Sequence, residues 1–283
     1  MIGYLLSFFY FRDQDLDHLA ALTGRPGVKF FADSGAFSAF TSGKPISRNE
    51  YATWLRTWSH VVDPYVNLDV KFDLPATLDN QQHLEGLGLH PAPVFHLGES
   101  LDLFREMVQR HDFVAIGNLT TGSKRDPKLW GLVDVLHGIA AEHSCGLHGF
   151  GLSSWPMVSR FPWKSVDSSS MGASFRYGSM KVWDFYSRRW ISWRTGDSGA
   201  WHRHGWLLRE YGFEPGEFAG RSRKEQLVPL MRLAGATWAK ATEDLDGTNC
   251  YLVDLGFAQP CGGRARIEWY EQGVQMGLLA GAA

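Results

Sequence analysis

The chain has 283 residues, of which 44% are hydrophobic and 20% are charged, and its formal net charge is −2. This length and apolar content suit one large folded domain and argue against a disordered chain. The charge is uneven, because residues 160–209 hold nine Lys or Arg against three Asp or Glu.

The cysteines and the first residues bear on the cellular compartment. Cys145, Cys250 and Cys261 are few and widely spaced, so a disulfide framework is not expected and a reducing interior fits. The opening run MIGYLLSFFYFRDQD has no basic n-region and no small-residue cleavage site, so we interpret it as a first buried strand. No segment has the length and apolarity to span a bilayer. These features predict a cytoplasmic protein without a membrane partner.

Short apolar runs alternate with amphipathic helical patterns along the chain. Strands are expected at 2–10, 28–32, 65–70, 92–96, 113–116, 147–150 and 163–166. Helices are expected at 14–22, 48–60, 77–87, 100–110, 127–143 and 153–159. Ser47, placed three residues before Glu50, and Ser100 are the expected N-caps of two of these helices. The alternation predicts an α/β fold, and a spacing of about thirty residues favours a TIM-like (β/α)8 barrel over an open sheet.

The pattern changes in the C-terminal half. Residues from about 172 to 220 alternate aromatic and basic side chains and predict a β-rich insertion, and a helix at about 222–241 could close the barrel. No linker interrupts the chain, so we expect a single barrel domain over 1–283 that carries this insertion. The segment after it, including GGRARIEWYEQG, receives no assignment.

Aspartates follow three of the apolar runs. Asp33 ends FFAD, Asp167 lies in SVDSSS, and Asp69 and Asp73 lie in NLDVKFD. Two carboxylates that flank a glycosidic bond are the usual requirement for breaking it. The alternative is that each aspartate caps a helix or is simply solvated, which is the interpretation favoured for Asp73 and not for Asp69.

Two glycine-containing turns follow the fifth and sixth expected strands. The turn GNL can present backbone N–H groups to a planar ligand or an anion, and HGFG can let a flat base approach the backbone closely. Each turn could equally be an ordinary tight connection.

The ordered set ADSGAFS, NLDV, AIGNL, HGFG and SVDSSS resembles the tRNA-guanine transglycosylase superfamily, and most closely its phage and bacterial DNA-guanine transglycosylases. The resemblance covers roughly residues 28 to 170. It implies a (β/α)8 barrel that exchanges guanine in a polynucleotide for a 7-deazaguanine such as 7-cyano-7-deazaguanine (preQ0). The exchange would pass through a covalent aspartyl-sugar intermediate, in the host cytoplasm if a phage encodes the protein.

The resemblance also implies roles for individual residues. Asp167 would be the nucleophile and Asp33 the general acid and base. Asp69 would read the base, and Phe37 would stack on it or border it. The implied substrate-binding residues are Asp69, Ser34, Phe37, His96, Gly117, Asn118, Leu119, His148 and Gly149, with Asn118 in place of a glycine of the family's Gly-Gly-Leu loop.

One family feature is missing from the sequence. The tRNA enzymes carry a Cys-x-Cys-x-x-Cys…His zinc motif after the nucleophile, and this chain has no such run. Cys250 and Cys261 with His202 and His204 form an irregular alternative set whose spacing is not diagnostic. We therefore expect no required cofactor and no metal site, and the missing motif puts tRNA docking in doubt.

The expected polymeric partner is DNA, and the second ligand is the free 7-deazaguanine base. Cations bind phosphates, and indoles can stack on bases or form a buried aromatic core. The expected phosphate-binding residues are Arg176, Lys181, Arg188, Arg189, Arg194 and Arg203. Base exchange on tRNA, and a glycoside or nucleoside hydrolase that uses the same two aspartates, remain the alternatives. The oligomeric state stays open.

Overall fold

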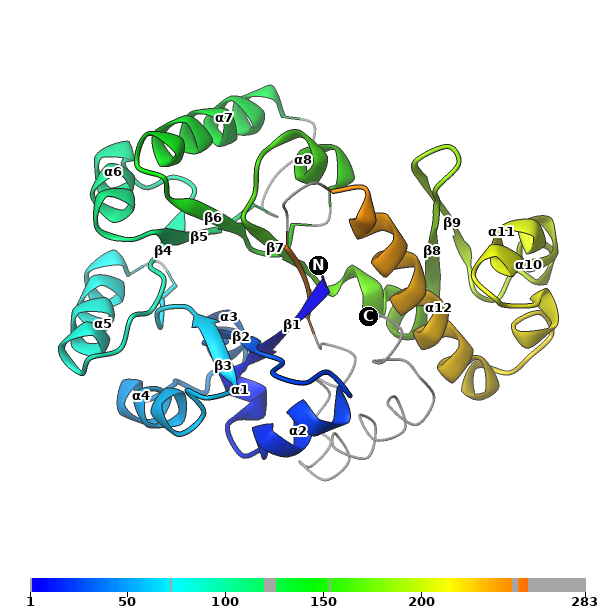
Figure 1. Cartoon of the computed structure of the whole chain (residues 1–283), viewed down its shortest axis with the longest axis horizontal. Helices are drawn as coiled ribbons and strands as arrows, with labels where there is room; N and C mark the ends of the chain where they lie inside the picture. Colours follow the sequence, from blue (N-terminus) through cyan, green and yellow to red (C-terminus); the bar gives the residue numbers. More distant parts are fainter. Residues whose placement is uncertain (1, 72, 120–125, 153, 246–248, 254–283) are drawn as a thin grey trace.

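The computed structural model describes residues 2–71, 73–119, 126–152, 154–245 and 249–253. Within these residues, eight parallel strands form one sheet in the order β3-β2-β1-β10-β7-β6-β5-β4 (Figure 1). The strands are β1 (Ile2–Ser7), β2 (Phe30–Asp33), β3 (Val62–Tyr65), β4 (Val94–His96), β5 (Phe113–Gly117), β6 (Gly146–Gly149), β7 (Ser165–Ser168) and β10 (Asn249–Val253).

Helices connect successive strands and surround the sheet (Figure 1). The connecting helices are α2 (Leu16–Leu22), α4 (Arg48–Thr57), α5 (Leu74–Gly86), α6 (Leu101–Arg110), α7 (Pro127–Glu142), α8 (Trp155–Arg160) and α12 (Arg223–Glu243). Shorter helical segments are α1 (Phe8–Phe11), α3 (Ala36–Ser42), η1 (Ser169–Gly172) and α9 (Ala173–Tyr177). The protein is therefore an α/β protein with a parallel sheet.

Side-chain caps fix where several of these helices begin. The Ser47 hydroxyl accepts from the Glu50 N–H at 3.4 Å, and the Ser100 hydroxyl accepts from the Leu103 N–H at 3.2 Å. Each bond satisfies a backbone donor that has no partner inside its own helix. Both predicted N-caps are thereby confirmed. Asp73 caps α5 in the same way, through Ala76 N–H at 3.0 Å.

The seven expected strands are all present, but some boundaries were wrong. The first strand ends at Ser7, and Phe8–Phe11 form α1, in which Phe8 and Phe11 are buried. A continuous apolar run has no period that would separate strand from helix. The third strand occupies Val62–Tyr65, ahead of the expected 65–70. The eighth strand, β10, was not predicted.

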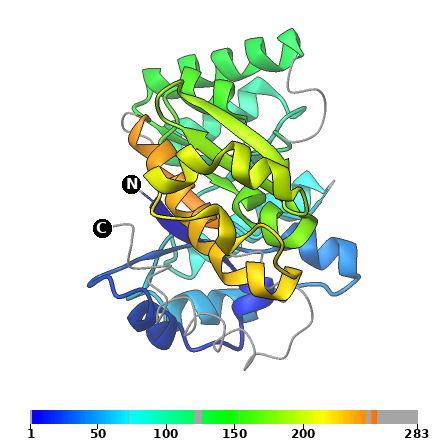
Figure 2. The same ribbon diagram turned by 90° about the vertical axis from the view of Figure 1, so that its right-hand side faces the viewer.

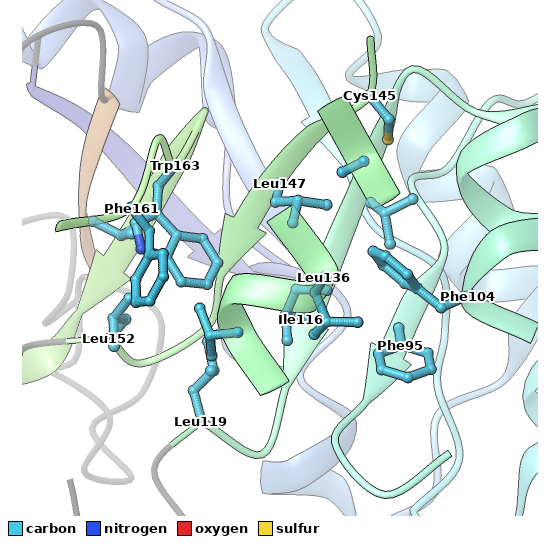
Figure 3. Packing of buried hydrophobic residues seen from close by; sticks show 14 of the residues in the cluster. Phe95, Phe104, Ile116, Leu119, Leu136, Cys145, Leu147, Leu152, Phe161 and Trp163 are labelled. Carbon is cyan, nitrogen blue, oxygen red and sulfur yellow. The ribbon is translucent and has the colours of Figure 1, made fainter. Parts of the chain in front are cut away.

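The strands divide their side chains between an inner and an outer layer, because successive residues of a strand point to opposite faces. Leu5, Phe31, Val94 and Ala115 form an inner cluster. Their immediate neighbours in sequence pack outward against the helices, as Figure 3 shows for Phe95 and Ile116 with Phe104 of α6 and Leu136 of α7.

The sheet is strongly curved. The rings of Phe31 on β2 and Phe113 on β5 lie 6.1 Å apart, although these strands stand near opposite ends of the strand order. Residues next to the two edge strands also pair: Val66 and Ala92 form a parallel bridge, and the Ala92 N–H donates to the Tyr65 carbonyl at 2.9 Å. The two edges of the sheet therefore approach one another.

The insertion lies between β7 and α12. It contains a hairpin of β8 (Ser179–Asp184) and β9 (Arg189–Arg194), followed by α10 (Ser198–Arg203), α11 (Gly205–Glu210) and η2 (Pro215–Glu217). Its buried residues, among them Trp193, Trp201 and Phe218, pack against Leu230 and Leu233 of α12. Figure 2 shows this layer on the outer side of α12. The insertion is a hairpin with short helices, and is less β-rich than expected.

Candidate active site

The polar side chains at the carboxyl ends of the strands point into the curved sheet. Asp33 lies two residues after Phe31, and His96 lies two residues after Val94, so both share the inner face with these residues of the inner cluster. Asp167 follows the outward-packed Val166 and also points inward. Because parallel strands end at a common edge, these side chains converge.

Asp167 is held by donors from β6 and from the loop that follows it. Its Oδ1 accepts from the Gly151 N–H at 2.8 Å and lies 3.2 Å from His148 Nε2. His148 Nδ1 in turn lies 2.8 Å from the Ser165 hydroxyl. Asp167 is 7% exposed, and His148 is fully buried. These two contacts fix the position of the Asp167 carboxyl group.

Asp33 has a different environment. Burial of its carboxyl group, together with the nearby charges of Asp69 and Asp167, raises the pKa of Asp33 to about 7, against the opposing effect of hydrogen bonds from the Gly35 and Ser34 N–H groups. Asp33 is not a helix N-cap, since α3 begins after Gly35. This carboxyl group can therefore exchange a proton near neutral pH.

A charged cluster lies beside Asp33. His96 Nε2 is 3.2 Å from Asp69 Oδ2, and His96 Nδ1 is 3.7 Å from Glu99 Oε1. Hydrogen bonds to Asp69 and then to Glu99 raise the pKa of His96 to about 9, so the ring is an imidazolium at neutral pH. The buried Ser34 hydroxyl donates to Asp69 Oδ1 at 3.4 Å. Asp69 is thus oriented from both sides.

The GNL turn supports this cluster. A Cβ on Gly117 would lie 2.6 Å from Cδ2 of the His96 ring, so only glycine allows the ring to rest there. Asn118 is exposed and has a φ of 62°, a left-handed conformation that Asn tolerates better than most residues. Asn118 thus adopts a backbone conformation typical of glycine. Leu119 is buried, so its contact with a ligand would come from the backbone.

Gly149 stands behind the site. A Cβ there would meet Leu152 and Trp163 at 3.1 Å and Leu119 at 3.3 Å, and Figure 3 shows these three side chains packed in one cluster. Glycine at this position therefore lets the GNL and HGFG turns pack together. His148 bonds Asp167 from a position that solvent does not reach.

An exposed aromatic pair stands on α3, directly after Asp33. Phe37 is 68% exposed and Phe40 55% exposed. The Lys71 ammonium lies 5.1 Å from the centre of the Phe37 ring and 4.5 Å from that of Phe40. Phe37 therefore offers a ring face at the border of the site.

The expected phosphate-binding residues spread over the insertion. Lys181, Arg188, Arg189, Arg194 and Arg203 are exposed. Several also have protein partners: Arg188 pairs with Asp244 at 3.4 Å, Arg203 with Asp197 at 3.2 Å, and Arg194 donates to the Tyr177 carbonyl at 3.2 Å. Arg176 lies on α9, and its side chain is outside the described part of the structure.

The tryptophans of the insertion serve mainly as core. Trp183, Trp193 and Trp201 are buried. Trp183 contacts Trp155 of α8 at 4.4 Å between ring centres. Trp206 is 45% exposed. Stacking on nucleic acid is therefore open to few of these indoles.

Sequence reasoning assigned no role to three participants in the site. Glu99 bonds the His96 N–H at 2.9 Å as well as its ring, and Ser165 and Gly151 complete the contacts around Asp167 and His148. The spacing held a signal for two of them. Glu99 is three residues after His96, and Ser165 is two residues before Asp167 on the same face of a strand.

The described residues contain no group of three or more His, Cys, Asp or Glu side chains arranged to hold a metal ion. Of the irregular zinc set, His202 is exposed and His204 stacks on Trp193 at 4.8 Å, whereas Cys261 and the side chain of Cys250 lie outside the described part. Among the helices that the structure describes, none has the length and apolarity to cross a membrane. Comparisons with models of protein families, with curated proteins and with solved structures give no match.

Proposed function

We propose that the curved sheet closes into a (β/α)8 barrel whose carboxyl-terminal rim carries an active site for guanine exchange in DNA. The bridge between Val66 and Ala92 supports closure, and so does the contact of Phe31 with Phe113 across the inner face. In such barrels, catalytic side chains come from the ends of several strands. Asp33, His96 and Asp167 are distributed in this way.

The observation that carries the function is the unequal environment of two carboxyl groups that influence one another. Asp167 is anchored by the Gly151 N–H and by His148, whereas burial and the neighbouring carboxylates disfavour the charge of Asp33. Two neighbouring carboxyl groups, one buried with a raised pKa and the other held by hydrogen bonds, are typical of an acid paired with a nucleophile or base. We assign Asp167 as the nucleophile and Asp33 as the acid.

The reaction then has two displacements at C1′ of the sugar. Asp167 attacks C1′, the bond between C1′ and N9 of guanine breaks, and its electron pair takes the proton of Asp33. The incoming 7-deazaguanine loses its N9 proton to the Asp33 carboxylate, and N9 displaces Asp167 from C1′. A group with a pKa of about 7 serves both steps, because at neutral pH about half of it is protonated. The two inversions retain the configuration of the sugar.

Asp69 is suited to recognise the base. Its contact with His96 holds the carboxyl group in place, and a carboxylate can accept together from N1–H and from the exocyclic amine of guanine. The backbone of Gly117 and Asn118 and the ring of Phe37 complete a site for a flat purine. The free 7-deazaguanine carries the same donor edge, so one site accepts both bases.

The polymer contacts come from the insertion near Asp167. Lys181 and Ser192 are cross-strand partners, as are Ser179 and Arg194, so Lys181 and Arg194 share one face of the hairpin. The end of the hairpin that carries Lys181 and Arg194 is joined to β7 by the short helices η1 and α9. Arg189 lies at the other end, beside the hairpin turn. Cations there can bind phosphates on either side of a nucleotide turned out of the helix, as access to C1′ requires. DNA is favoured over tRNA because the sequence lacks the zinc motif of the tRNA enzymes.

An exchange assay tests this function. Duplex DNA or tRNA labelled in guanine is incubated with 7-cyano-7-deazaguanine, and release of guanine is followed for the unaltered protein, Asp167→Ala and Asp73→Ala. Asp73 is the matched control, because it caps α5 and takes no part in the site. We expect release from DNA that requires the incoming base, disappears in Asp167→Ala and persists in Asp73→Ala.

The other outcomes separate the alternatives. Release from tRNA alone would keep the chemistry and change the polymer. Release without the incoming base would indicate a hydrolase. No release from either polymer, with DNA still bound, would refute base exchange.

A further inference from the structure

The contacts of His148 place it behind the reacting group. His148 on β6 and Ser165 on β7 are direct neighbours in the sheet register, and Asp167 lies two residues beyond Ser165 on the same face. Both His148 and Ser165 are at most 1% exposed. The sequence predicted that His148 binds the substrate base. A ring so deeply buried would have to move to contact that base, whereas it already contacts Asp167 and Ser165.

Donors and acceptors in this row can be assigned. An ionised carboxylate only accepts hydrogen bonds, so His148 Nε2 carries the hydrogen that bonds Asp167. In the tautomer that carries this single hydrogen, Nδ1 is an acceptor and the Ser165 hydroxyl donates to it. The Ser165 hydroxyl, which can donate as well as accept, is therefore compatible with the tautomer of His148 that holds Asp167 and orients its ring.

The imidazole also has little freedom to move. The ring of Phe31 lies 4.5 Å from it and that of Phe150 lies 4.7 Å from it, both edge-on, and Phe113 lies at 6.3 Å. These contacts come from β2, β5 and the turn after β6. The ring is thus fixed by packing as well as by hydrogen bonds.

All the hydrogen bonds that the described residues give to the Asp167 carboxylate end on Oδ1. We propose that His148, oriented by Ser165, is a positioning residue that fixes Oδ1 of Asp167 and leaves Oδ2 directed at C1′ of the substrate. This inference rests on the proposed function, because it assigns the attacking atom of that reaction. Oδ2 forms the bond to C1′, the guanine N9 leaves with the electron pair, and the His148 hydrogen stays on Nε2.

Single-turnover formation of the covalent adduct tests the proposal. The unaltered protein, His148→Leu, His148→Gln and Ser165→Ala are mixed with labelled guanine-containing DNA in the absence of incoming base, and DNA affinity is measured separately. The matched control is His137→Leu. His137 is another buried histidine, which lies on α7 and packs against Phe161 and Trp163 on the outer side of the sheet.

Loss of orientation should slow the chemical step without weakening binding. We expect His148→Leu to form adduct about 100-fold more slowly and Ser165→Ala about tenfold more slowly, with DNA affinity within about twofold of the unaltered protein. His148→Gln should recover at least about tenfold over His148→Leu, because its amide supplies a donor near the position of Nε2. His137→Leu should react at the unaltered rate.

Three results would overturn the positioning role: equal rates for His148→Leu and His137→Leu, no recovery by His148→Gln while Ser165→Ala reacts normally, or an Nδ1–H tautomer of His148 in ring-nitrogen NMR. Ser165→Ala removes one oxygen and keeps the test valid if His148→Leu does not fold. Absence of adduct in the unaltered protein would contradict the proposed function itself. Adduct formation by the unaltered protein together with one of the three results above would contradict only the positioning role of His148.

Discussion

Replacement of Asp33 by asparagine is expected to stabilise the protein at alkaline pH and to abolish base exchange. The carboxyl group of Asp33 has a pKa of about 7 in the folded protein against 3.8 as the ordinary value, because burial and the charges of Asp69 and Asp167 disfavour its ionised form. The folded state therefore binds more protons than the unfolded state between these two values, and stability falls as pH rises through this window. Asparagine has no charge to lose, so the variant escapes this fall.

The magnitude follows from the shift. Each pKa unit corresponds to about 1.4 kcal/mol, so the ionisation cost grows from about 1 kcal/mol at about pH 4.5 to about 4 kcal/mol at about pH 8.5. The free energy of unfolding of Asp33→Asn relative to the unaltered protein should therefore rise by up to about 3 kcal/mol between these conditions. Residual solvent contact of the side chain reduces the value from this upper bound.

Urea unfolding of both proteins at the two pH values measures this difference directly. A difference in unfolding free energy that does not change with pH would refute the argument that Asp33 is protonated in the folded protein near neutral pH. Asp73→Asn, at an exposed helix cap, is the control and should show no comparable rise.

Further predictions concern the cluster and the insertion. Gly117→Ala should raise the KM for the base about tenfold, because a Cβ would displace the His96 ring, while Gly131→Ala, where a Cβ meets open space, should leave kinetics unchanged. His96→Gln should lower the free energy of unfolding at neutral pH. This loss should shrink as pH rises through about 9, because the unaltered ring loses its charge there. A difference between the two unfolding free energies that stays constant up to about pH 10 would contradict this. Lys181→Glu should weaken DNA binding, and reduce the dependence of that binding on salt, more than Arg189→Glu does. Binding titrations at several salt concentrations measure both effects. Equal effects of the two substitutions would contradict the placement of DNA at the end of the hairpin that carries Lys181.

The sequence carried most of the information about which residues meet at the strand ends. Alternation within FFAD and SVDS places Asp33 and Asp167 on the inner face once the strands are known, and parallel pairing brings them to one edge. The helix caps at Ser47 and Ser100 depend on local bonds only, and for that reason they could be predicted.

Other features depend on contacts between distant segments, which local patterns do not encode. The helical turn at Phe8 follows from packing against Tyr51 and Trp54, with ring centres 5.2 and 5.5 Å away. The link between Asp69 and His96 joins the ends of two different strands. The alternation of basic and aromatic residues left the tryptophans open between base stacking and a buried core, and the structure places Trp193 and Trp201 in the core of the insertion.

The central claim is that Asp167 attacks the sugar, and peptide mapping of the trapped adduct tests it most directly. The protein is incubated with guanine-containing DNA without incoming base, denatured and digested with nuclease and protease, and the peptides are analysed by mass spectrometry. The account predicts a deoxyribosyl ester on the peptide that contains Asp167, released when 7-cyano-7-deazaguanine is added before denaturation. An adduct on another residue, or guanine release with no adduct on any peptide, would contradict it.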